Sequence, residues 1–332
     1  MPESDQYRIR AFRSEDEGAW DELVHSSCNG TFMHTRRFLS YHRDRFADQS
    51  LVVLDGKGKA RGVFPAAINP HDRSMVMSHP GATYGGVVHD GSLRGGRMLD
   101  VVGAVSRHYE EMGFSGIQYR ATPYIYHRVP AEDDVYAMFR LGAKRYRCDL
   151  SATIDLASRQ RPMRMRLKRQ RRASRLGVMA RWGWSDCEAF WDILRENLRE
   201  RYDVEPAHTL EEIVTLSELF PANVKLLVAV MDDHVIAGGI LYLAYPTVHL
   251  QYSSANDIGK ESGGLDVIVE DSINLAIEEG FRYYDFGHSN EQDGNILNGP
   301  LYDFKVSFGA GGTIFEHYEI DCTRRDDGNP NC

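Results

Sequence analysis

The sequence is poor in cysteine, and its few cysteines are not spaced like metal ligands or disulfide partners. Five cysteines occur among 332 residues, and no two of them form a C-x-x-C pair. Small disulfide-stapled folds and structural zinc sites both depend on closely spaced cysteines, so neither is expected here. The pattern is typical of a protein from a reducing cytoplasm.

Long apolar runs are missing as well. The longest apolar stretches, such as residues 226–230, have the length of a strand, whereas a membrane-spanning helix needs about 20 apolar residues. The opening residues, Met-Pro-Glu-Ser-Asp-Gln, contain no apolar segment of the kind found in signal peptides. We therefore expect a cytoplasmic protein without stable membrane insertion.

The motifs of several enzyme classes are also absent. The sequence contains neither the G-x-S-x-G turn of serine hydrolases nor the Gly-Lys-Ser/Thr of phosphate-binding P-loops, and residues 309–313 do not fit G-x-G-x-x-G. His288, Glu291 and Asp293 lie close together, but their spacing is not specific to a metal centre. We expect neither a metal nor a bound cofactor.

Charge is distributed unevenly, although the net charge is only −9. Residues 1–150 carry 20 basic and 19 acidic side chains and are nearly neutral. Residues 151–180 carry 9 basic and 1 acidic side chain, whereas residues 181–332 carry 10 basic and 28 acidic ones. A short basic block thus joins a neutral half to an acidic half, which suggests a charged partner.

Three sequence blocks recur in the same order in the two halves. Residues 14–23 (SEDEGAWDEL) align with residues 185–194 (SDCEAFWDIL) at an offset of 171. A hairpin pattern at 51–64 recurs at 226–241, and a helix followed by a strand at 99–120 recurs at 265–286. Each half therefore predicts a strand, a helix, a hairpin, a helix and a strand.

This repetition predicts an α/β (α+β) fold formed by tandem duplication of one unit, with mixed sheets flanked by helices. The first unit is expected to cover residues 1–155. The second is expected to cover residues 156–332, to open with a basic helix and to carry the active cleft.

The basic block predicts a helix over residues 162–176. Ser158 can cap it, Pro162 suits its first turn and Gly177 suits its end. A thin, weakly apolar stripe for docking comprises Met163, Leu167, Gln170 and Ser174. A cationic stripe, widened by Arg166, Arg169 and Arg172, comprises Arg161, Arg164, Lys168, Arg171 and Arg175. We expect Arg164, Lys168, Arg171 and Arg175 to bind nucleic-acid phosphates; the acidic half of the chain and anionic lipid are the alternatives.

The densest set of hydrogen-bonding side chains lies in the loop of residues 287–300. This loop is rich in Asp, Asn and Gly, follows an aromatic strand at 281–286 and precedes an aromatic run with a single lysine at 301–309. The arrangement predicts the rim and floor of a site.

These motifs resemble those of the Fem family of aminoacyl transferases, which belongs to the GNAT acyltransferase superfamily. The matching segments are Tyr284-Asp285-Phe286-Gly287, Leu301-Tyr302-Asp303-Phe304-Lys305-Val306-Ser307-Phe308-Gly309 and Gly30-Thr31-Phe32-Met33-His34. The resemblance implies two tandem GNAT-like units without the coiled-coil arm of some members. It also implies transfer of an aminoacyl group from aminoacyl-tRNA to the amine of a small-molecule or peptide acceptor, which forms an amide.

Lys305 is the main catalytic candidate, because the resemblance places this lysine at the acyl-transfer centre. Acyl transfer passes through an oxyanion, which one fixed donor can stabilise by about 3 kcal/mol. Asp285 is a candidate base for the attacking amine, although it could instead cap the loop backbone. The candidates for substrate binding are Arg36, Arg201, His288, Glu291, Asn298, Tyr302 and Asp303.

Two other functions are compatible with the sequence. An acyl-CoA-dependent N-acyltransferase would place its phosphate loop at residues 256–264, where glycines precede a helix N-terminus. Their spacing departs from the acyl-CoA pattern, and Asp257 and Glu261 would repel a pyrophosphate. The third function is a non-catalytic module that binds a ligand through the 287–300 loop.

Overall fold

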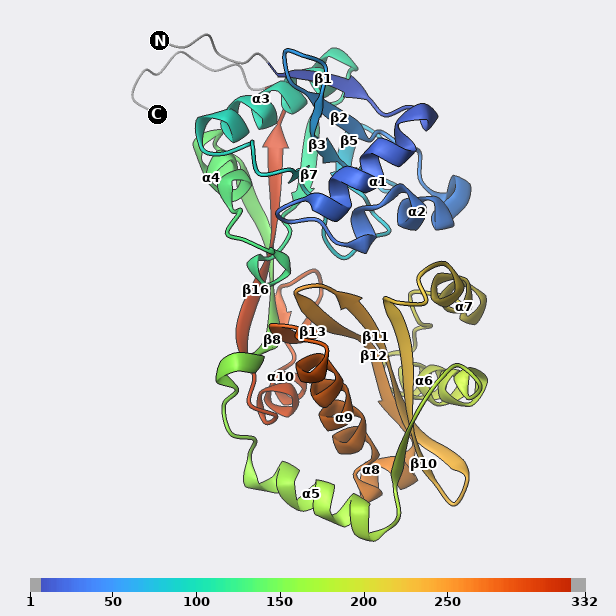
Figure 1. The fold of residues 1–332 in the computed structure, drawn as a ribbon. Coiled ribbons are helices and arrows are strands. Elements are labelled where there is room, and N and C mark those ends of the chain that lie inside the picture. Colours follow the sequence, from blue (N-terminus) through green and yellow to red (C-terminus); the bar gives the residue numbers. More distant parts are fainter. Residues whose placement is uncertain (1–6, 324–332) are drawn as a thin grey trace. The chain divides into compact units, whose positions relative to one another are not determined.

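The computed structural model describes residues 7–323, which form two compact units (Figure 1). Unit 1 contains residues 7–149 and 314–323, and unit 2 contains residues 150–313. The chain passes between the units twice, in β8 (Lys144–Asp155) and in β16 (Gly311–Asp321). From the sequence we predicted that all residues after 155 belong to the second unit. Strand β16 instead returns to unit 1, because it pairs antiparallel with β7 (Gly116–Arg120).

Unit 1 alternates helices with short strands. Its α-helices are α1 (Glu17–Ser26), α2 (Arg36–Leu39), α3 (Gly96–Glu111) and α4 (Asp133–Arg140). Its 3-10 helices are η1 (Ser14–Asp16), η2 (Phe32–His34), η3 (Ser40–Arg45) and η4 (Tyr124–Tyr126). Its other strands are β1 (Arg8–Ala11), β2 (Leu51–Leu54), β3 (Ala60–Phe64), β4 (Ala66–Ile68), β5 (Met75–Ser78) and β6 (Val88–His89).

Two strand arrangements make up unit 1. One sheet has the order β1-β2-β3-β6, and the other strands of the unit follow the order β4-β5-β7-β16. Their buried side chains, including Val53, Phe64, Val76 and Ile117, pack with Val101 of α3 in one apolar cluster. Burial of this apolar surface is the main stabilising contribution to the unit.

Unit 2 contains the basic helix and the predicted site. Its helices are η5 (Leu156–Ser158), α5 (Arg164–Arg175), α6 (Cys187–Tyr202), α7 (Leu210–Leu219), α8 (Asp257–Ser262), α9 (Gly264–Glu278) and α10 (Gly299–Val306). Its strands, besides part of β8, are β9 (Met179–Trp182), β10 (Val224–Met231), β11 (His234–Ala244), β12 (Thr247–Ala255), β13 (Tyr283–His288), β14 (Asn290–Glu291) and β15 (Ile296–Leu297).

The sheet of unit 2 has the order β8-β13-β12-β11-β10-β9 and is covered on both faces. Successive residues of a strand point to opposite faces. On β11 a side chain at Gly238 would meet Phe190 of α6, and one at Gly239 would meet Ile268 of α9. Helix α6 therefore covers one face, and α9 covers the other (Figure 1).

Both long predicted helices end in the same way. At the end of α3, Gly113 has a φ of 88°, and the Phe114 N–H donates to the Tyr109 carbonyl. At the end of α9, Gly280 has a φ of 76°, and the Phe281 N–H donates to the Ala276 carbonyl. Glycine favours this left-handed turn because it lacks a Cβ.

The predicted repeat pattern matches the elements found in each unit. In both units the strand after the long helix runs parallel to an earlier strand: β7 pairs with β5, and β13 pairs with β12. The predicted hairpins are present as β2–β3 and β10–β11. A tandem origin of the two units stays a prediction, since similar topology does not by itself demonstrate duplication.

The helices of residues 7–323 are short. The longest, α3 and α6, have 16 residues each, and in this part of the chain no helix has the length and apolar character needed to cross a membrane.

Candidate functional site

The centre of the candidate site is Asp285, a fully buried carboxylate on β13. Its Oδ1 accepts hydrogen bonds from the Ser151 hydroxyl and, at 3.0 Å, from the Thr153 hydroxyl. Its Oδ2 lies 2.8 Å from Nδ1 of His249. A buried carboxylate is costly unless its oxygens are paired, and here hydrogen bonds reach both oxygens.

Strand register explains why these side chains meet. Asp285 pairs with Thr153 on the antiparallel neighbour β8 and with His249 on the parallel neighbour β12. The adjacent residues Ile154 and Tyr284 belong to the apolar cluster beneath α9. Since side chains alternate along a strand, the polar cluster lies on the opposite face of the sheet from α9.

The position of Asp285 in the sheet is also distinctive. Strands β12 and β13 pair in parallel only over three residue pairs, of which His249 with Asp285 is the last. Beyond this pair the two strands have no ladder, and a register irregularity follows Asp285 in β13. The polar cluster therefore lies where the two strands stop pairing.

The tautomer of His249 follows from its partner. An ionised carboxylate can only accept hydrogen bonds, so the contact with Asp285 places the His249 proton on Nδ1. In the neutral imidazole, Nε2 then carries the free electron pair. His249 Nε2 makes no hydrogen bond with any residue between 7 and 323.

Lys305 lies in the last turn of α10 and is buried. Its ammonium donates to the backbone carbonyls of Gly287, at 2.8 Å, and His288, at 2.7 Å. Burial lowers the pKa of Lys305 from its ordinary 10.5 to about 8, although the nearby Asp285 carboxylate acts in the opposite direction. An ammonium has three N–H donors, so one remains beyond the two carbonyl contacts.

The predicted polar loop contains a short β-hairpin. Strands β14 and β15 pair Asn290 with Leu297 and Glu291 with Ile296. The Asn298 amide donates to Glu291 at 2.7 Å, and its Oδ1 caps α10 by accepting from the Leu301 N–H. The hairpin thus fixes the start of the helix that carries Lys305.

The remaining candidates in this region have different surroundings. The side chains of His288 and Asp303 are exposed, and Tyr302 is half-buried against the apolar cluster beneath α9. Arg201 lies exposed in the last turn of α6. The roles of these residues in substrate binding stay predictions.

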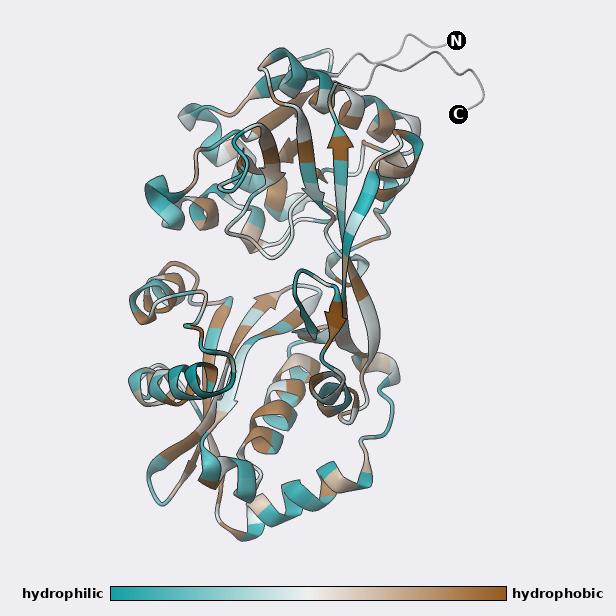
Figure 2. Ribbon diagram, turned by 180° about the vertical axis from the view of Figure 1, so that it is seen from behind, coloured by the Kyte–Doolittle hydropathy of each residue, from teal (hydrophilic) through white to brown (hydrophobic). Residues whose placement is uncertain are grey.

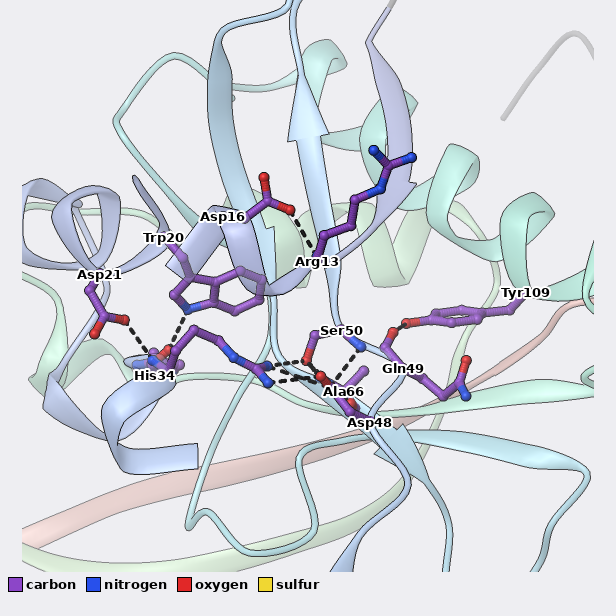
Figure 3. A network of polar contacts seen from close by, with 11 residues as sticks. Arg13, Asp16, Trp20, Asp21, His34, Asp48, Gln49, Ser50, Ala66 and Tyr109 are labelled. Carbon is purple, nitrogen blue, oxygen red and sulfur yellow. Dashed lines mark hydrogen bonds and ion pairs between the residues drawn. The ribbon is translucent and has the colours of Figure 1, made fainter. Parts of the chain in front are cut away.

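Arg36 belongs to unit 1 and is already engaged by its surroundings. Its guanidinium lies 2.8 Å from Asp48 and stacks over the Phe12 ring at 3.9 Å. Asp48 also accepts from Ser50, whose hydroxyl accepts from the Ala66 N–H (Figure 3). This network gives Arg36 a structural role, and its predicted contact with substrate stays a prediction.

Two arginines of helix α5 face inward and connect it to the rest of unit 2. Arg166 is buried and donates to Asp266 of α9 at 3.2 Å and to Ser307 at 2.7 Å. Arg169 donates to the other oxygen of Asp266 at 2.9 Å. Met163 is 55% exposed. Of the predicted docking stripe, Met163 and Ser174 are exposed, whereas Leu167 and Gln170 are half-buried. The assignment of Arg166 and Arg169 to the cationic face was wrong, because Asp266 pairs with both arginines.

The outward face of α5 is cationic, and it carries the four residues that we predicted to bind nucleic-acid phosphates. Arg164, Lys168, Arg171 and Arg175 are all exposed. Their spacing of four, three and four residues places them on one side of a helix, along about 16 Å of its length. The buried Ala173 lies on the other side. Figure 2 shows α5 as mainly hydrophilic, in contrast to α9.

Three members of the polar cluster were not identified from the sequence: His249, Ser151 and Thr153. A usable signal existed, because Ser151-Ala152-Thr153-Ile154 alternates polar with apolar residues and His249 stands between Val248 and Leu250. Alternation identifies a strand with one polar face. It does not indicate which strands become neighbours.

Comparison with known proteins identifies the fold. A family model described as "Acetyltransferase (GNAT) domain" matches residues 139–305. FemX has a similar structure, with a TM-score of 0.65 and 11% identity over 93% of this chain and 96% of its own. L-PGS from Bacillus licheniformis has a TM-score of 0.58 and 10% identity, over 92% and 91% of the two chains.

A tandem GNAT protein from the clavulanic acid biosynthesis pathway is also similar. Its TM-score is 0.51, with 10% identity over 96% of this chain and 100% of its own. None of the curated proteins compared matches this chain. At these identities the likeness establishes a Fem-like GNAT fold, and the chemistry has to be argued from the site.

Proposed function

We propose a reaction for this chain, starting from the finding that it belongs to the acetyltransferase (GNAT) domain family. In this reaction the chain moves an aminoacyl group from aminoacyl-tRNA to an amine acceptor. The protein is an acyltransferase with a Fem-like fold. The proposal adds to this class a particular donor, aminoacyl-tRNA, and a particular product bond, the amide. The acceptor is a small molecule or a peptide with a free amine.

The observation that carries the proposal is the position of Lys305. A buried ammonium is held 2.8 and 2.7 Å from two consecutive backbone carbonyls, at the end of the strand that carries Asp285. Its remaining N–H can donate to the oxyanion that forms when an amine attacks an ester carbonyl. Such a donor acts strongly because it is fixed before the reaction and partly shielded from water.

Each bond change can be assigned. The amine nitrogen attacks the carbonyl carbon of the aminoacyl ester, and the carbonyl oxygen becomes an oxyanion facing Lys305. The bond between the carbonyl carbon and the ribose oxygen then breaks. The products are an amide and a tRNA with a free hydroxyl group, and the reaction needs no metal or redox partner to balance.

Two features favour aminoacyl-tRNA over acyl-CoA as the donor. The C-terminal domain of a putative lysylphosphatidylglycerol synthetase from Agrobacterium fabrum has a similar fold, and the name of that protein points to a lysyl group as its substrate. In this chain the segment before α9 carries Asp257, whose side chain is 92% exposed, and the exposed Glu261. Asp257 is paired with Lys260, so it is Glu261 that adds an uncompensated negative charge and disfavours a pyrophosphate, although a helix N-terminus alone would attract one.

Ribonuclease separates the two donors. Transfer from aminoacyl-tRNA should stop when ribonuclease is added before the enzyme, whereas transfer from acetyl-CoA should continue. A ribonuclease-resistant product formed from acetyl-CoA would replace the proposed donor with acyl-CoA. Absence of any covalent product with either donor would favour a ligand-binding module.

The cationic face of α5 should make tRNA binding sensitive to salt. Each phosphate contact contributes roughly 0.7–0.9 to the slope of log affinity against log salt concentration. Arg164→Ala with Lys168→Ala should therefore reduce that slope by about 1.5 in a fluorescence binding titration. The matched control is Arg195→Ala with Arg199→Ala on α6, because those arginines pair with Glu205. An equal change of the slope in both double variants would show that α5 is not part of the tRNA-binding surface.

The rate of amide formation should fall at alkaline pH. The pKa of Lys305 is lowered to about 8 by burial, so the ammonium loses its charge as the pH rises through this value, and oxyanion stabilisation weakens. Deprotonation of the acceptor amine acts in the opposite direction, so the comparison is made with Lys305→Arg, which stays charged. The decline of kcat/KM above pH 8 should disappear in this variant, and its persistence would assign the decline to another group.

A further inference from the structure

We propose that His249, oriented by Asp285, accepts the proton of the attacking amine and returns it to the leaving oxygen. The inference rests on the proposed function, since it assigns the proton transfers of the same reaction. It concerns a histidine that the sequence motifs do not include. Acyl transfer to an amine needs such a group, because the nitrogen must lose a proton before the amide is stable.

The orientation of His249 is set by a carboxylate that cannot readily turn away. One oxygen of Asp285 is occupied by the hydroxyls of Ser151 and Thr153, and the other is 2.8 Å from His249 Nδ1. These contacts come from the two strands that flank β13. The carboxylate therefore keeps the imidazole in the tautomer whose Nε2 can take a proton, as in the acid–histidine pairs of hydrolases.

The imidazole of His249 and the ammonium of Lys305 both lie next to one residue, Gly287. A Cβ added to Gly287 would lie 3.2 Å from Cε1 and 3.9 Å from Nε2 of His249. The carbonyl of the same glycine accepts from Lys305 at 2.8 Å. A base and a cation thus border the same short piece of backbone, and the missing side chain leaves space beside the imidazole.

The groups around His249 suit this role. Asp285 of β13 contacts its Nδ1, and its direct partner on β11 is Tyr242. The Ser151 and Thr153 hydroxyls of β8 contact the other oxygen of Asp285. From α10, Lys305 interacts electrostatically with Asp285. The Asp285 carboxylate stabilises the imidazolium that forms when Nε2 takes a proton, and its negative charge offsets part of the repulsion between the imidazolium and the Lys305 ammonium.

The proton balance closes within the reaction. The acceptor enters as a neutral amine, and after its nitrogen bonds to the carbonyl carbon one N–H proton passes to Nε2. When the bond to the ribose oxygen breaks, the same proton moves from Nε2 to that oxygen. His249 ends neutral, and nothing is oxidised or reduced.

The tautomer can be measured without any substrate. In imidazole ¹⁵N NMR spectra of the full-length protein, His249 should be protonated on Nδ1 and bare on Nε2. Asp285→Asn should shift the population toward the Nε2–H form, since an amide can donate to Nδ1. Observation of the Nε2–H tautomer in the unmodified protein would overturn the proposal, whichever donor the enzyme uses.

Kinetics then test the proton transfer itself. His249→Ala should lower kcat by about a hundredfold or more, the usual range for a general base. Added imidazole should restore part of the rate, because it can occupy the vacated space and take the proton. His234→Ala changes an exposed histidine at the start of β11; it is the matched control and should keep full activity. A folded His249→Ala protein with nearly full activity, or one that imidazole does not rescue, would overturn the proposal.

The two proposals fail in distinguishable ways. If amide forms only from acetyl-CoA, the aminoacyl-tRNA donor is wrong, and the His249 variants are compared with that donor instead. If amide forms from aminoacyl-tRNA but His249→Ala is fully active, the proposed function stands and the base assignment falls. If no donor gives a product, the NMR tautomer still decides whether His249 is arranged as a base.

Discussion

Lys305→Met should lower kcat/KM for amide formation by about a hundredfold or more, while the acceptor still binds. The ammonium is the buried cation beside Asp285, and loss of one fixed oxyanion donor costs about 3 kcal/mol of transition-state stabilisation. The effect should fall mainly on kcat, because the oxyanion exists only in the transition state and the intermediate. Acceptor binding is followed by calorimetry and turnover by mass spectrometry.

A structural explanation of the same loss has to be excluded. Lys305 also satisfies the carbonyls of Gly287 and His288, so methionine leaves two acceptors without their donor, at a cost of roughly 1–3 kcal/mol each. The urea midpoint of the variant reports this cost. Lys260→Met is the matched control, since this lysine pairs with Asp257 on the surface. Normal turnover in a folded Lys305→Met protein would contradict the assignment of Lys305.

Asp266→Ala should destabilise unit 2 by about 3–5 kcal/mol. Asp266 is 1% exposed and is paired with both Arg166 and Arg169, and removal of one partner of a buried ion pair leaves an uncompensated charge. Arg166 cannot easily reach water, because it is packed against the rings of Phe304 and Phe308 at 4.4 and 4.6 Å. Helix α5 should detach before the rest of the unit unfolds.

Urea unfolding followed by tryptophan fluorescence measures this change. Three of the four tryptophans, Trp182, Trp184 and Trp191, lie in unit 2, so the signal reports mainly on that unit. Asp257→Ala is the control, because solvent screens its exposed pair with Lys260 and the pair contributes little to stability. Equal destabilisation by the two substitutions would show that the pairing of α5 with Asp266 is not an important contact.

Local features of the fold were predictable from the sequence. The hairpin β2–β3 was indicated by Asp55-Gly56, and the ends of α3 and α9 were indicated by Gly113 and Gly280. These signals depend on a few neighbouring residues, so a single sequence reveals them. The Lys305 motif was found through a family resemblance, and its burial beside Asp285 gives that motif a physical reason.

Features that depend on distant partners could not be predicted. Arg166 and Asp266 are 100 positions apart, and their pairing decides which face of α5 is buried. His249 and Asp285 are 36 positions apart and become neighbours only because β12 and β13 run in parallel. The return of β16 to unit 1 likewise depends on its pairing with β7. Side-chain alternation identifies such strands but not their neighbours.

The central claim is that this acyltransferase takes its acyl group from aminoacyl-tRNA. The most direct measurement offers both donors at once: a pool of tRNAs charged with ¹³C-labelled amino acids and deuterated acetyl-CoA, with candidate amines, followed by mass spectrometry. The account predicts an amide that carries the ¹³C label of one amino acid and disappears in Lys305→Met. An amide that carries only the deuterated acetyl group would contradict it.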